Sequence, residues 1–330
     1  MKKSISSMPS MRTRSIVLLS AAFWGLTAFS ALAQTKVVAF TAIVEHPALD
    51  AVRDGVLESL KQAGFVDGKN FKFVYQSAQG SPATAAQIAR KFVGDGVDII
   101  VPASTPSAQA VVSATKDIPV VFAAITDPVA AKLVKSWSPS GTNVTGVSDL
   151  SPIDRHLDLI TKIIPTAKRL GVIYSPGEAN SVALVEILRK ETKTKGMTLV
   201  EAPAQRTVDI AAAAQSLVGK VDAIYVPTDN NVISAIESVI KVAQQSKIPL
   251  IAADTDSVKR GAIAALGMNY HDLGLQTGRI VVRVLKGEKP GQISPELSQK
   301  FELHVNPEAA MKQGVTLSAD FIKSAAVVIK

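Results

Sequence analysis

Three polar residues stand directly before a proline, each where a predicted strand gives way to a predicted helix. They are His46, Thr105 and Asp127. A polar side chain there can cap the helix, and proline suits the first helical position because its missing N–H would be unbonded anyway. A helix N-terminus offers free N–H groups and a positive dipole end, so several such turns together could hold a carboxylate or phosphate. For each turn alone, capping is the other interpretation.

The second half of the chain places carboxylates at the corresponding turns. These turns are Ser175 to Ser181, Thr228-Asp229-Asn230 and Asp254-Thr255-Asp256. With Glu45 and Asp127 opposite, they predict a cleft that can hold an ammonium group. One side with N–H groups and one with carboxylates favours a zwitterion such as an amino acid. For Asp254 and Asp256, capping is an equal alternative. Ser81-Pro82 and Ser151-Pro152 repeat the polar-proline pair, and we place the first away from the cleft.

The motifs of common enzyme classes are absent. The sequence has no Gly-x-Gly-x-x-Gly after a strand, no Gly-Lys-Ser/Thr phosphate loop and no Gly-x-Ser-x-Gly elbow. None of the four histidines is spaced as a helical metal pair, and His156 and His271 are interpreted as solvated or capping. A catalytic pair made from Asp254 and Asp256 would lack a His or Lys to complete it. We therefore expect a protein that is not an enzyme and that holds no metal or cofactor.

Strand-like and helical segments alternate along most of the chain. Apolar runs bounded by turns predict strands, and apolar residues three and four positions apart predict helices. The predicted strands are 37–43, 71–75, 98–101, 119–124, 169–174, 198–201, 223–226, 249–252, 262–266 and 301–305. The predicted helices are 48–63, 83–93, 107–115, 181–195, 210–218, 232–245 and 273–285. The alternation is typical of an α/β fold with parallel sheets covered by helices on both faces.

The two halves also share sequence, which indicates an internal duplication. Val97 to Pro102 is echoed by Val221 to Pro227, and Ile118-Pro119 with Thr126-Asp127 is echoed by Ile248-Pro249 with Thr255-Asp256. We expect an N-terminal lobe over 34–148, completed by about 268–298, and a C-terminal lobe over 149–267, completed by about 299–330. Gly141 to Leu150 is interpreted as the first crossing between them.

Residues 1–33 have the pattern of a secretory signal peptide. Four basic residues precede an apolar run from Ile16 to Phe29, and Ala31-Leu32-Ala33 supplies a cleavage site. The run is shorter than the ~20 residues that span a bilayer. Without this segment the net charge falls from +8 to +4, which gives no case for nucleic-acid binding. The chain has no cysteine, which excludes disulfides and a lipid-anchor Cys. We expect a soluble, monomeric periplasmic protein that is not membrane-embedded.

Six segments resemble those of the substrate-binding protein family of ABC transporters that includes the tryptophan/tyrosine-type periplasmic binding proteins. They are Glu45 to Asp50, Ala103 to Pro106, Thr126 to Val129, Asn143 to Ser148, Asp222 to Asn230 and Asp254 to Val258. The resemblance extends over roughly Lys36 to Thr316. It implies a type I periplasmic-binding-protein fold with two Rossmann-like lobes, a three-stranded hinge, and an amino acid, often aromatic, as ligand. Ser104 departs from the pattern, because relatives often have another small residue there.

The resemblance also implies a set of ligand contacts that face the cleft. They are Glu45, His46, Ser77, Thr105, Asp127, Ser148, Asn180, Asp229 and Asp256. In this assignment Asp229 and Asp256 meet an ammonium group, while Thr105 and nearby N–H groups meet a carboxylate. The expected function is capture of a small polar ligand by hinge closure and its transient delivery to a membrane permease. The alternatives are a sugar- or organic-anion-binding sensor and a periplasmic enzyme that uses the same cleft.

Overall fold

The computed structural model describes residues 35–298 and 300–330, so the expected signal peptide lies outside the described residues. Residues 35–330 form one compact unit. Their strands make two sheets in which the pairs are parallel apart from one antiparallel pair. This arrangement confirms the predicted α/β class.

The first sheet and the helices that cover it are called the first lobe here. The strand order is β11 (Glu296–Leu297), β5 (Val144–Ser148), β4 (Val120–Ile125), β3 (Ile99–Ala103), β1 (Lys36–Ala42) and β2 (Phe71–Ser77). One face carries α1 (Pro47–Gln62) and α10 (Tyr270–Leu285), and the other carries α2 (Pro82–Gly94) and α3 (Thr105–Ala114). Strands β1, β3 and β4 are buried almost throughout, as expected for a parallel sheet covered on both faces.

The second sheet and its helices are called the second lobe. The strand order is β13 (Val327–Val328), β12 (Phe301–Val305), β10 (Ala264–Met268), β9 (Leu250–Ala252), β8 (Ala223–Val226), β6 (Arg169–Tyr174) and β7 (Thr198–Pro203), with β12 antiparallel to β10. One face carries α4 (Ile153–Ile163), α5 (Ala179–Thr194), α11 (Pro307–Lys312) and α12 (Ala319–Lys323). The other carries α6 (Ile210–Ser216), α7 (Asn230–Ser234), α8 (Ile236–Ser246) and α9 (Asp256–Arg260). Short 3-10 helices span Thr207–Asp209 and Pro290–Gln292.

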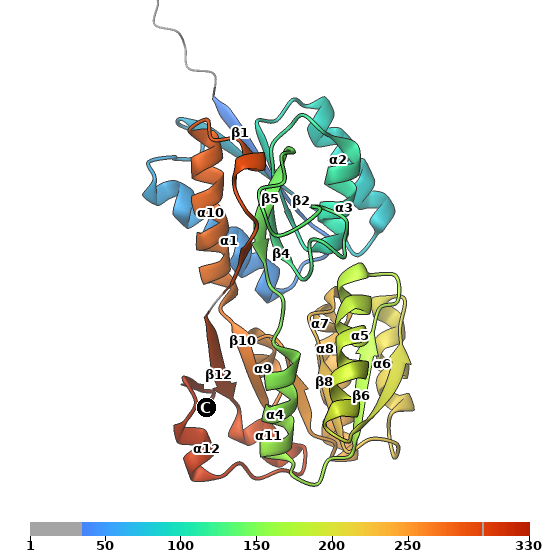
Figure 1. Cartoon of the computed structure of the whole chain (residues 1–330). Helices are drawn as coiled ribbons and strands as arrows, with labels where there is room; N and C mark the ends of the chain where they lie inside the picture. Colours follow the sequence, from blue (N-terminus) through green and yellow to red (C-terminus); the bar gives the residue numbers. More distant parts are fainter. Residues whose placement is uncertain (1–34, 299) are drawn as a thin grey trace, which may run out of the picture. The chain divides into compact units, whose positions relative to one another are not determined.

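The chain passes between the lobes after β5, after β10 and after β11. The first passage leads from Ser148 to α4, and the second from Met268 through Asn269 to α10 (Figure 1). The side chain of Asn269 caps α10 by accepting hydrogen bonds from the N–H groups of His271 and Asp272. A cap directly after a strand makes this passage short and well defined.

Helix α10 is held against α1 by a close approach of the two backbones (Figure 1). A Cβ atom built on Gly274 would lie 2.3 Å from the carbonyl oxygen of Val52, and one built on Gly55 would lie 2.3 Å from the carbonyl oxygen of His271. Only glycine fits at both positions, because a real Cβ does not approach an oxygen that closely. The segment after the second passage is therefore packed firmly into the first lobe.

Several local predictions were wrong. No helix follows Asp127-Pro128: residues 128–132 form turns, and the carboxylate of Asp127 accepts from the N–H groups of Val129 and Ala130 at 2.9 Å each. The predicted helix 232–245 is divided at Ala235 into α7 and α8. The predicted crossing at 141–150 contains strand β5.

His156 is neither solvated nor a cap. Its side chain lies buried between Tyr225 and the carbonyl oxygen of Leu266, with its ring nitrogens 2.6 and 2.7 Å from them. Because a carbonyl only accepts, Nε2 carries the proton and Nδ1 accepts from the tyrosine hydroxyl. Burial lowers the pKa of His156 to about 4, so the ring is neutral.

Candidate ligand-binding cleft

A small enclosed cavity lies where the carboxyl ends of the strands of the two lobes meet. Its volume is only about 20 Å³, which is far below the usual range for ligand pockets. Both lobes and both described hinge passages line it. The lining residues are His46, Leu49, Ser104, Thr105, Ala124, Thr126, Asp149, Asn180, Thr228, Asn230, Ile233 and Tyr270.

Buried polar atoms without a partner gather around this cavity. Among the described residues, eight buried side-chain atoms have no hydrogen-bond partner, and five of them belong to lining residues. The five are His46 Nε2, Ser104 Oγ, Thr105 Oγ1, Asn180 Oδ1 and Thr228 Oγ1. An unsatisfied buried polar atom costs free energy, so such a cluster is typical of a site that a polar ligand completes.

His46 contributes a hydrogen-bond donor to the cavity. Its Nδ1 accepts from the N–H of Leu49 at 3.4 Å at the start of α1, so the proton of the neutral ring resides on Nε2. Burial, with a smaller contribution from the positive charge of Arg260, lowers the pKa of His46 to about 4. The ring therefore presents an uncharged N–H at neutral pH.

The N-terminus of α3 is open toward the same cavity. Its N-cap residue, Ser104, makes no side-chain capping bond and has a φ of +76°. Ala124, at the end of β4, also has a positive φ of +52° and also lines the cavity. Positive φ costs about 1–3 kcal/mol in residues other than glycine and is common at ligand sites. The result is an uncapped helix start with two free hydroxyls, from Ser104 and Thr105, which suits an anionic group.

Asp149 places a carboxylate at the hinge side of the cavity. It follows β5 directly and accepts hydrogen bonds from Tyr270 (2.9 Å) and Thr126 (3.2 Å). Burial raises the pKa of Asp149 to about 6, although both hydrogen bonds favour the ionised form. The group is thus charged at neutral pH in a buried setting, where a cationic partner would stabilise it strongly.

Asn180 presents an acceptor from the second lobe. Its amide nitrogen donates to Glu178 Oε2 (3.2 Å) and to the carbonyl oxygen of Thr228 (3.0 Å), which uses both amide hydrogens. Its Oδ1 is buried and unpartnered. The cavity therefore has donors at His46 and α3, and acceptors at Asp149 and Asn180.

Three of the nine residues proposed from the sequence line this cavity: His46, Thr105 and Asn180. Thr105 is the first helical residue of α3, whereas we expected it at the N-cap, which Ser104 occupies.

The other six residues do not line the cavity. Glu45 accepts from the Tyr75 hydroxyl, Ser77 from the N–H of Gln79, and Asp127 caps its own turn. Ser148 is buried and donates to the carbonyl oxygen of Thr126. Asp256 pairs with Lys259 at 3.0 Å.

The sixth, Asp229, is fully buried. It accepts from Ser175, Ser181 and the N–H of Val232 at distances of 2.5–3.0 Å. Asp254 likewise accepts from the N–H and the hydroxyl of Ser257. For both carboxylates the capping interpretation describes the geometry.

Sequence reasoning missed Asp149 and Tyr270. Asp149 stands one residue beyond the matched segment that ends at Ser148, in a stretch interpreted only as a connection. Tyr270 follows Asn269, whose cap marks the start of α10. Their positions were the signal that could have found them: Asp149 directly follows β5, and Tyr270 stands two residues after the end of β10, and both strands end at the cleft.

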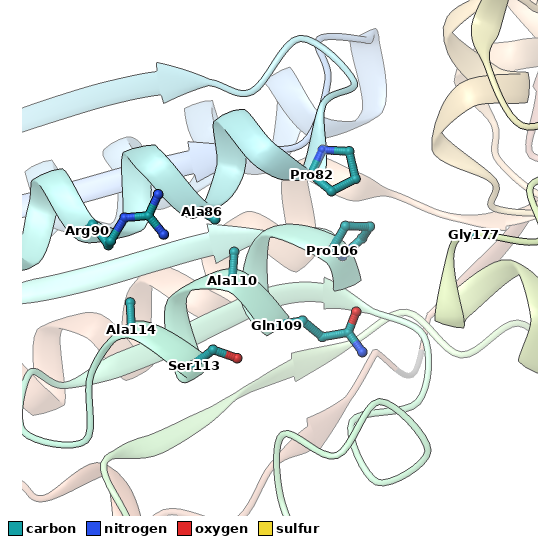
Figure 2. Close-up of a pocket in the computed structure, with 9 residues that line it drawn as sticks. All are labelled: Pro82, Ala86, Arg90, Pro106, Gln109, Ala110, Ser113, Ala114 and Gly177. Atoms are coloured by element: carbon teal, nitrogen blue, oxygen red, sulfur yellow. The ribbon is translucent and has the colours of Figure 1, made fainter.

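A separate surface groove of about 600 Å³ runs along α2 and α3 (Figure 2). Small side chains line much of it, with the guanidinium of Arg90 on one side and Gly177 of the second lobe near one end. Pro82 lies near Pro106 at the end nearest Gly177 (Figure 2), and a Cβ on Gly80 would lie 3.8 Å from Asn231 of the second lobe. The Ser81-Pro82 turn thus lies near the second lobe, but neither of its residues lines the ligand cavity.

Comparison with known proteins identifies the kind of protein to which this cleft belongs. Residues 37–329 match the family described as ABC transporter substrate binding protein.

The chain belongs to this family.

It is a family of solute-binding proteins and not of enzymes. Among the described residues no helix is long and apolar enough to cross a membrane, and no group of three or more His, Asp or Glu residues could hold a metal ion.

Two relatives of this substrate-binding chain are described with an aromatic amino acid as ligand. The Tyrosine-binding protein of Clostridioides difficile (strain R20291) is 42% identical over 289 residues, which cover 87% of this chain and 84% of the relative. The solved structure of an ABC domain in complex with L-Trp from Streptococcus pneumonia is 35% identical, with a TM-score of 0.86 over 89% of this chain and 100% of that one. More distant structures at 16% identity show the fold alone, that of type I periplasmic binding proteins.

A third relative indicates the state of the cleft. The ligand-free, open structure of a substrate binding protein with adhesive properties from Clostridium difficile is 40% identical, over 90% of this chain and 99% of that one, yet its TM-score is only 0.68. The L-Trp complex is less similar in sequence and more similar in structure. The lobes of this substrate-binding protein are thus arranged more as in the liganded relative than as in the open one.

Proposed function

We propose that this chain is the extracytoplasmic solute-binding component of an ABC importer and that its ligand is an aromatic L-amino acid. The observation that carries the proposal is the buried, unpaired polar set at the cavity, with donors on one side and acceptors on the other. An amino acid in its zwitterionic form satisfies both sides at once.

The ammonium group is assigned to Asp149 and Asn180. The carboxylate of Asp149 supplies the charge, and Oδ1 of Asn180 supplies a second acceptor from the opposite lobe. A hydrogen bond between a charged donor and a buried carboxylate is among the stronger ones in proteins. This assignment replaces the Asp229 and Asp256 pair that the sequence suggested, since Asp229 is occupied by other donors and Asp256 pairs with Lys259.

The carboxylate group is assigned to the N-terminus of α3 and to His46. The hydroxyls of Ser104 and Thr105 and the uncapped start of the helix face the cavity, and His46 adds the N–H of Nε2. Among the described residues no Lys or Arg side chain lines this cavity, so the positive end of the helix dipole supplies the complementary field.

The side chain of the ligand is assigned to the apolar part of the lining. Leu49, Ala124 and Ile233 offer aliphatic contacts, and the Tyr270 ring offers an aromatic one. The relatives named for tyrosine and crystallised with L-Trp support an aromatic ligand, since this chain matches most of their length. We expect the lobes to open further to admit so large a side chain.

Hinge closure is the proposed working cycle. A ligand that touches His46 of the first lobe and Asn180 of the second adds contacts that only the closed state has, so binding shifts the population toward closure. A membrane permease then recognises the closed form and binds it transiently. Residues 1–33 act as a cleavable leader that sends a monomeric protein to the periplasm, with 34–148 and 268–298 moving as one lobe and 149–267 and 299–330 as the other.

Calorimetric titration of the purified protein with L-tyrosine, L-tryptophan and two truncated analogues tests the proposal. Tyramine lacks the carboxylate and 3-(4-hydroxyphenyl)propionate lacks the amine. We expect one of the amino acids to bind and both analogues to lose affinity by about tenfold or more, because each leaves buried polar atoms unpaired. Binding of a sugar or of the deaminated acid in preference to the amino acids would favour the sugar or organic-anion alternative and overturn the zwitterion assignment. Consumption of the ligand would favour the enzyme alternative.

A further inference from the structure

Glu178 occupies a helix N-cap position without capping the helix. It stands directly before α5, and its side chain makes no bond to the N–H groups of that helix. The residue is only 7% exposed. A buried carboxyl at an N-cap would ordinarily accept from the second or third helical N–H, so its different orientation has to be explained by another set of partners.

Those partners are two asparagines that line the ligand cavity. Glu178 Oε2 accepts from Asn180 Nδ2 (3.2 Å), from Asn230 Nδ2 (2.6 Å) and from the backbone N–H of Asn230 (3.3 Å). Asn180 and Asn230 come from different helices, α5 and α7, and both line the cavity, whereas Glu178 does not. One oxygen atom therefore fixes the amide groups of both asparagines.

The orientation of the Asn180 amide follows from this arrangement. The carbonyl oxygen of Thr228 can only accept, so the nitrogen of the amide must face it, and the second amide hydrogen goes to Glu178. Oδ1 is then turned to the remaining side, where it is buried without a partner. Without Glu178 the amide of Asn180 would keep only its hydrogen bond to the carbonyl oxygen of Thr228 and could rotate about it.

We propose that Glu178 is a positioning residue for ligand recognition: it holds the amide of Asn180 so that Oδ1 faces the ligand as an acceptor for its ammonium group. The inference rests on the proposed function and assigns a role within that same site to a residue that does not line the cavity. In this proposal the preference for a ligand with an amine depends on a buried hydrogen-bond network formed by Glu178, Asn180 and Asn230.

The protonation state of Glu178 sharpens the test. Burial and the nearby carboxylate of Asp229 raise the pKa of Glu178 well above its usual range. All three donors converge on Oε2, which leaves Oε1 to carry the proton. A neutral carboxyl in this geometry has the shape and acceptor of a glutamine amide, so Glu178→Gln should keep the network while Glu178→Leu removes it.

Affinity for L-tyrosine and L-tryptophan, measured by calorimetry, provides the experiment. We expect Glu178→Gln to stay within about threefold of the wild type and Glu178→Leu to lose about tenfold or more, the loss of a hydrogen bond to a charged group. The double variant with Asn180→Leu should be no weaker than Asn180→Leu alone, because Glu178 acts through Asn180. Glu186→Leu, the same change at an exposed position of α5, is the control and should match the wild type.

Each other outcome has a definite meaning. If the wild type binds an amino acid and Glu178→Leu binds it equally well, the inference is overturned alone. The inference is also overturned if Glu178→Gln loses as much affinity as Glu178→Leu, because position 178 would then require an ionised carboxylate. It is likewise overturned if the affinity losses of Glu178→Leu and Asn180→Leu add up in the double variant. If Glu178→Leu does not fold, Glu178→Asp, which withdraws the carboxyl by one methylene, replaces it with the same expectation. A wild type that binds no amino acid overturns the proposed function, and the inference with it.

Discussion

The hydroxyl of Tyr270 donates a hydrogen bond of 2.9 Å to the carboxylate of Asp149, and the two residues stand on different passages between the lobes. Asp149 follows β5 and Tyr270 begins α10. Their contact thus joins two hinge segments at the side of the ligand cavity that they both line. A ligand that binds to Asp149 is also coupled to the geometry of the hinge.

Removing the hydroxyl in Tyr270→Phe should weaken ligand binding. Asp149 loses one of the two side-chain donors that favour its ionised form, so its pKa rises further. We expect the ligand affinity at pH 7 to fall by about three- to tenfold, the value of one hydrogen bond of 0.5–1.5 kcal/mol. Calorimetry at pH 7 and pH 8.5 measures this, and the deficit should be smaller at the higher pH. An equal deficit at both pH values would argue against a role for the Asp149 charge.

Ligand affinity in the wild type should depend on pH near the pKa of Asp149. That pKa is raised to about 6 by burial in the unliganded protein, while an ammonium partner favours the ionised carboxylate. Affinity should therefore be constant above about pH 7 and fall by up to about tenfold for each pH unit below 6, because protons compete with the ligand. A titration series between pH 5 and pH 8 measures the profile. A flat profile would exclude Asp149 as the ammonium partner.

The same carboxylate should lower the stability of the unliganded protein. Because the folded-state pKa lies above the ordinary value of about 3.9, unfolding is favoured as pH rises from about 4 to 6, by up to about 3 kcal/mol. Asp149→Asn should remove this penalty. We expect a higher midpoint of thermal unfolding at pH 7.5 together with loss of ligand binding. A variant that unfolds at a lower temperature than the wild type at pH 7.5 would contradict the assignment of a buried charge.

Gly274→Ala should destabilise the protein through the contact between α1 and α10. The new methyl group would lie 2.3 Å from the carbonyl oxygen of Val52, so the two backbones must separate. Overpacking of this kind costs about 1–3 kcal/mol. Gly94→Ala is the matched control, since its Cβ would meet nothing within 4 Å, and we expect a neutral or slightly stabilising effect. Denaturant unfolding measures both, and equal stabilities would contradict the close approach of the two helices.

His156→Leu should lower the free energy of unfolding by more than the same substitution at an exposed histidine. It leaves the hydroxyl of Tyr225 and the carbonyl oxygen of Leu266 buried without the partners that they have at 2.6 and 2.7 Å. Each unsatisfied group costs about 1–3 kcal/mol. His271→Leu is the control, because that ring is 38% exposed and pairs only with the surface residue Glu58. A comparable effect of both substitutions on the free energy of unfolding would refute the buried network.

Much of the fold was predictable because periodicity is local. Apolar runs such as 99–103 and 120–125 are buried on both sides of a parallel sheet and therefore stand out in the sequence. Asp127-Pro128 misled because the same residue types cap helices and tight turns, and only the geometry after β4 decides between them. Strand β5 was hidden in a polar stretch whose side chains find partners in other segments, as Thr145 does at the carbonyl oxygen of Ile293.

The site was predictable only where local chemistry and position coincide. His46 and Thr105 stand at helix starts that face the cavity, so their turns were visible in the sequence. Asp229 and Asp254 also stand at turns after strands, but their carboxylates accept hydrogen bonds from Ser181 and Ser257. The sequence alone does not reveal these partners. Asp149 reaches the cavity only through the path of the chain between lobes, and that path is a tertiary property.

A crystal structure of the protein with L-tyrosine or L-tryptophan bound would test the central claim most directly. The account predicts the ligand nitrogen within about 2.7–3.2 Å of both the Asp149 carboxylate and Asn180 Oδ1. It also predicts the ligand carboxylate at the start of α3, next to Ser104 and Thr105. A ligand bound in the reverse orientation, or bound outside this cavity, would contradict it.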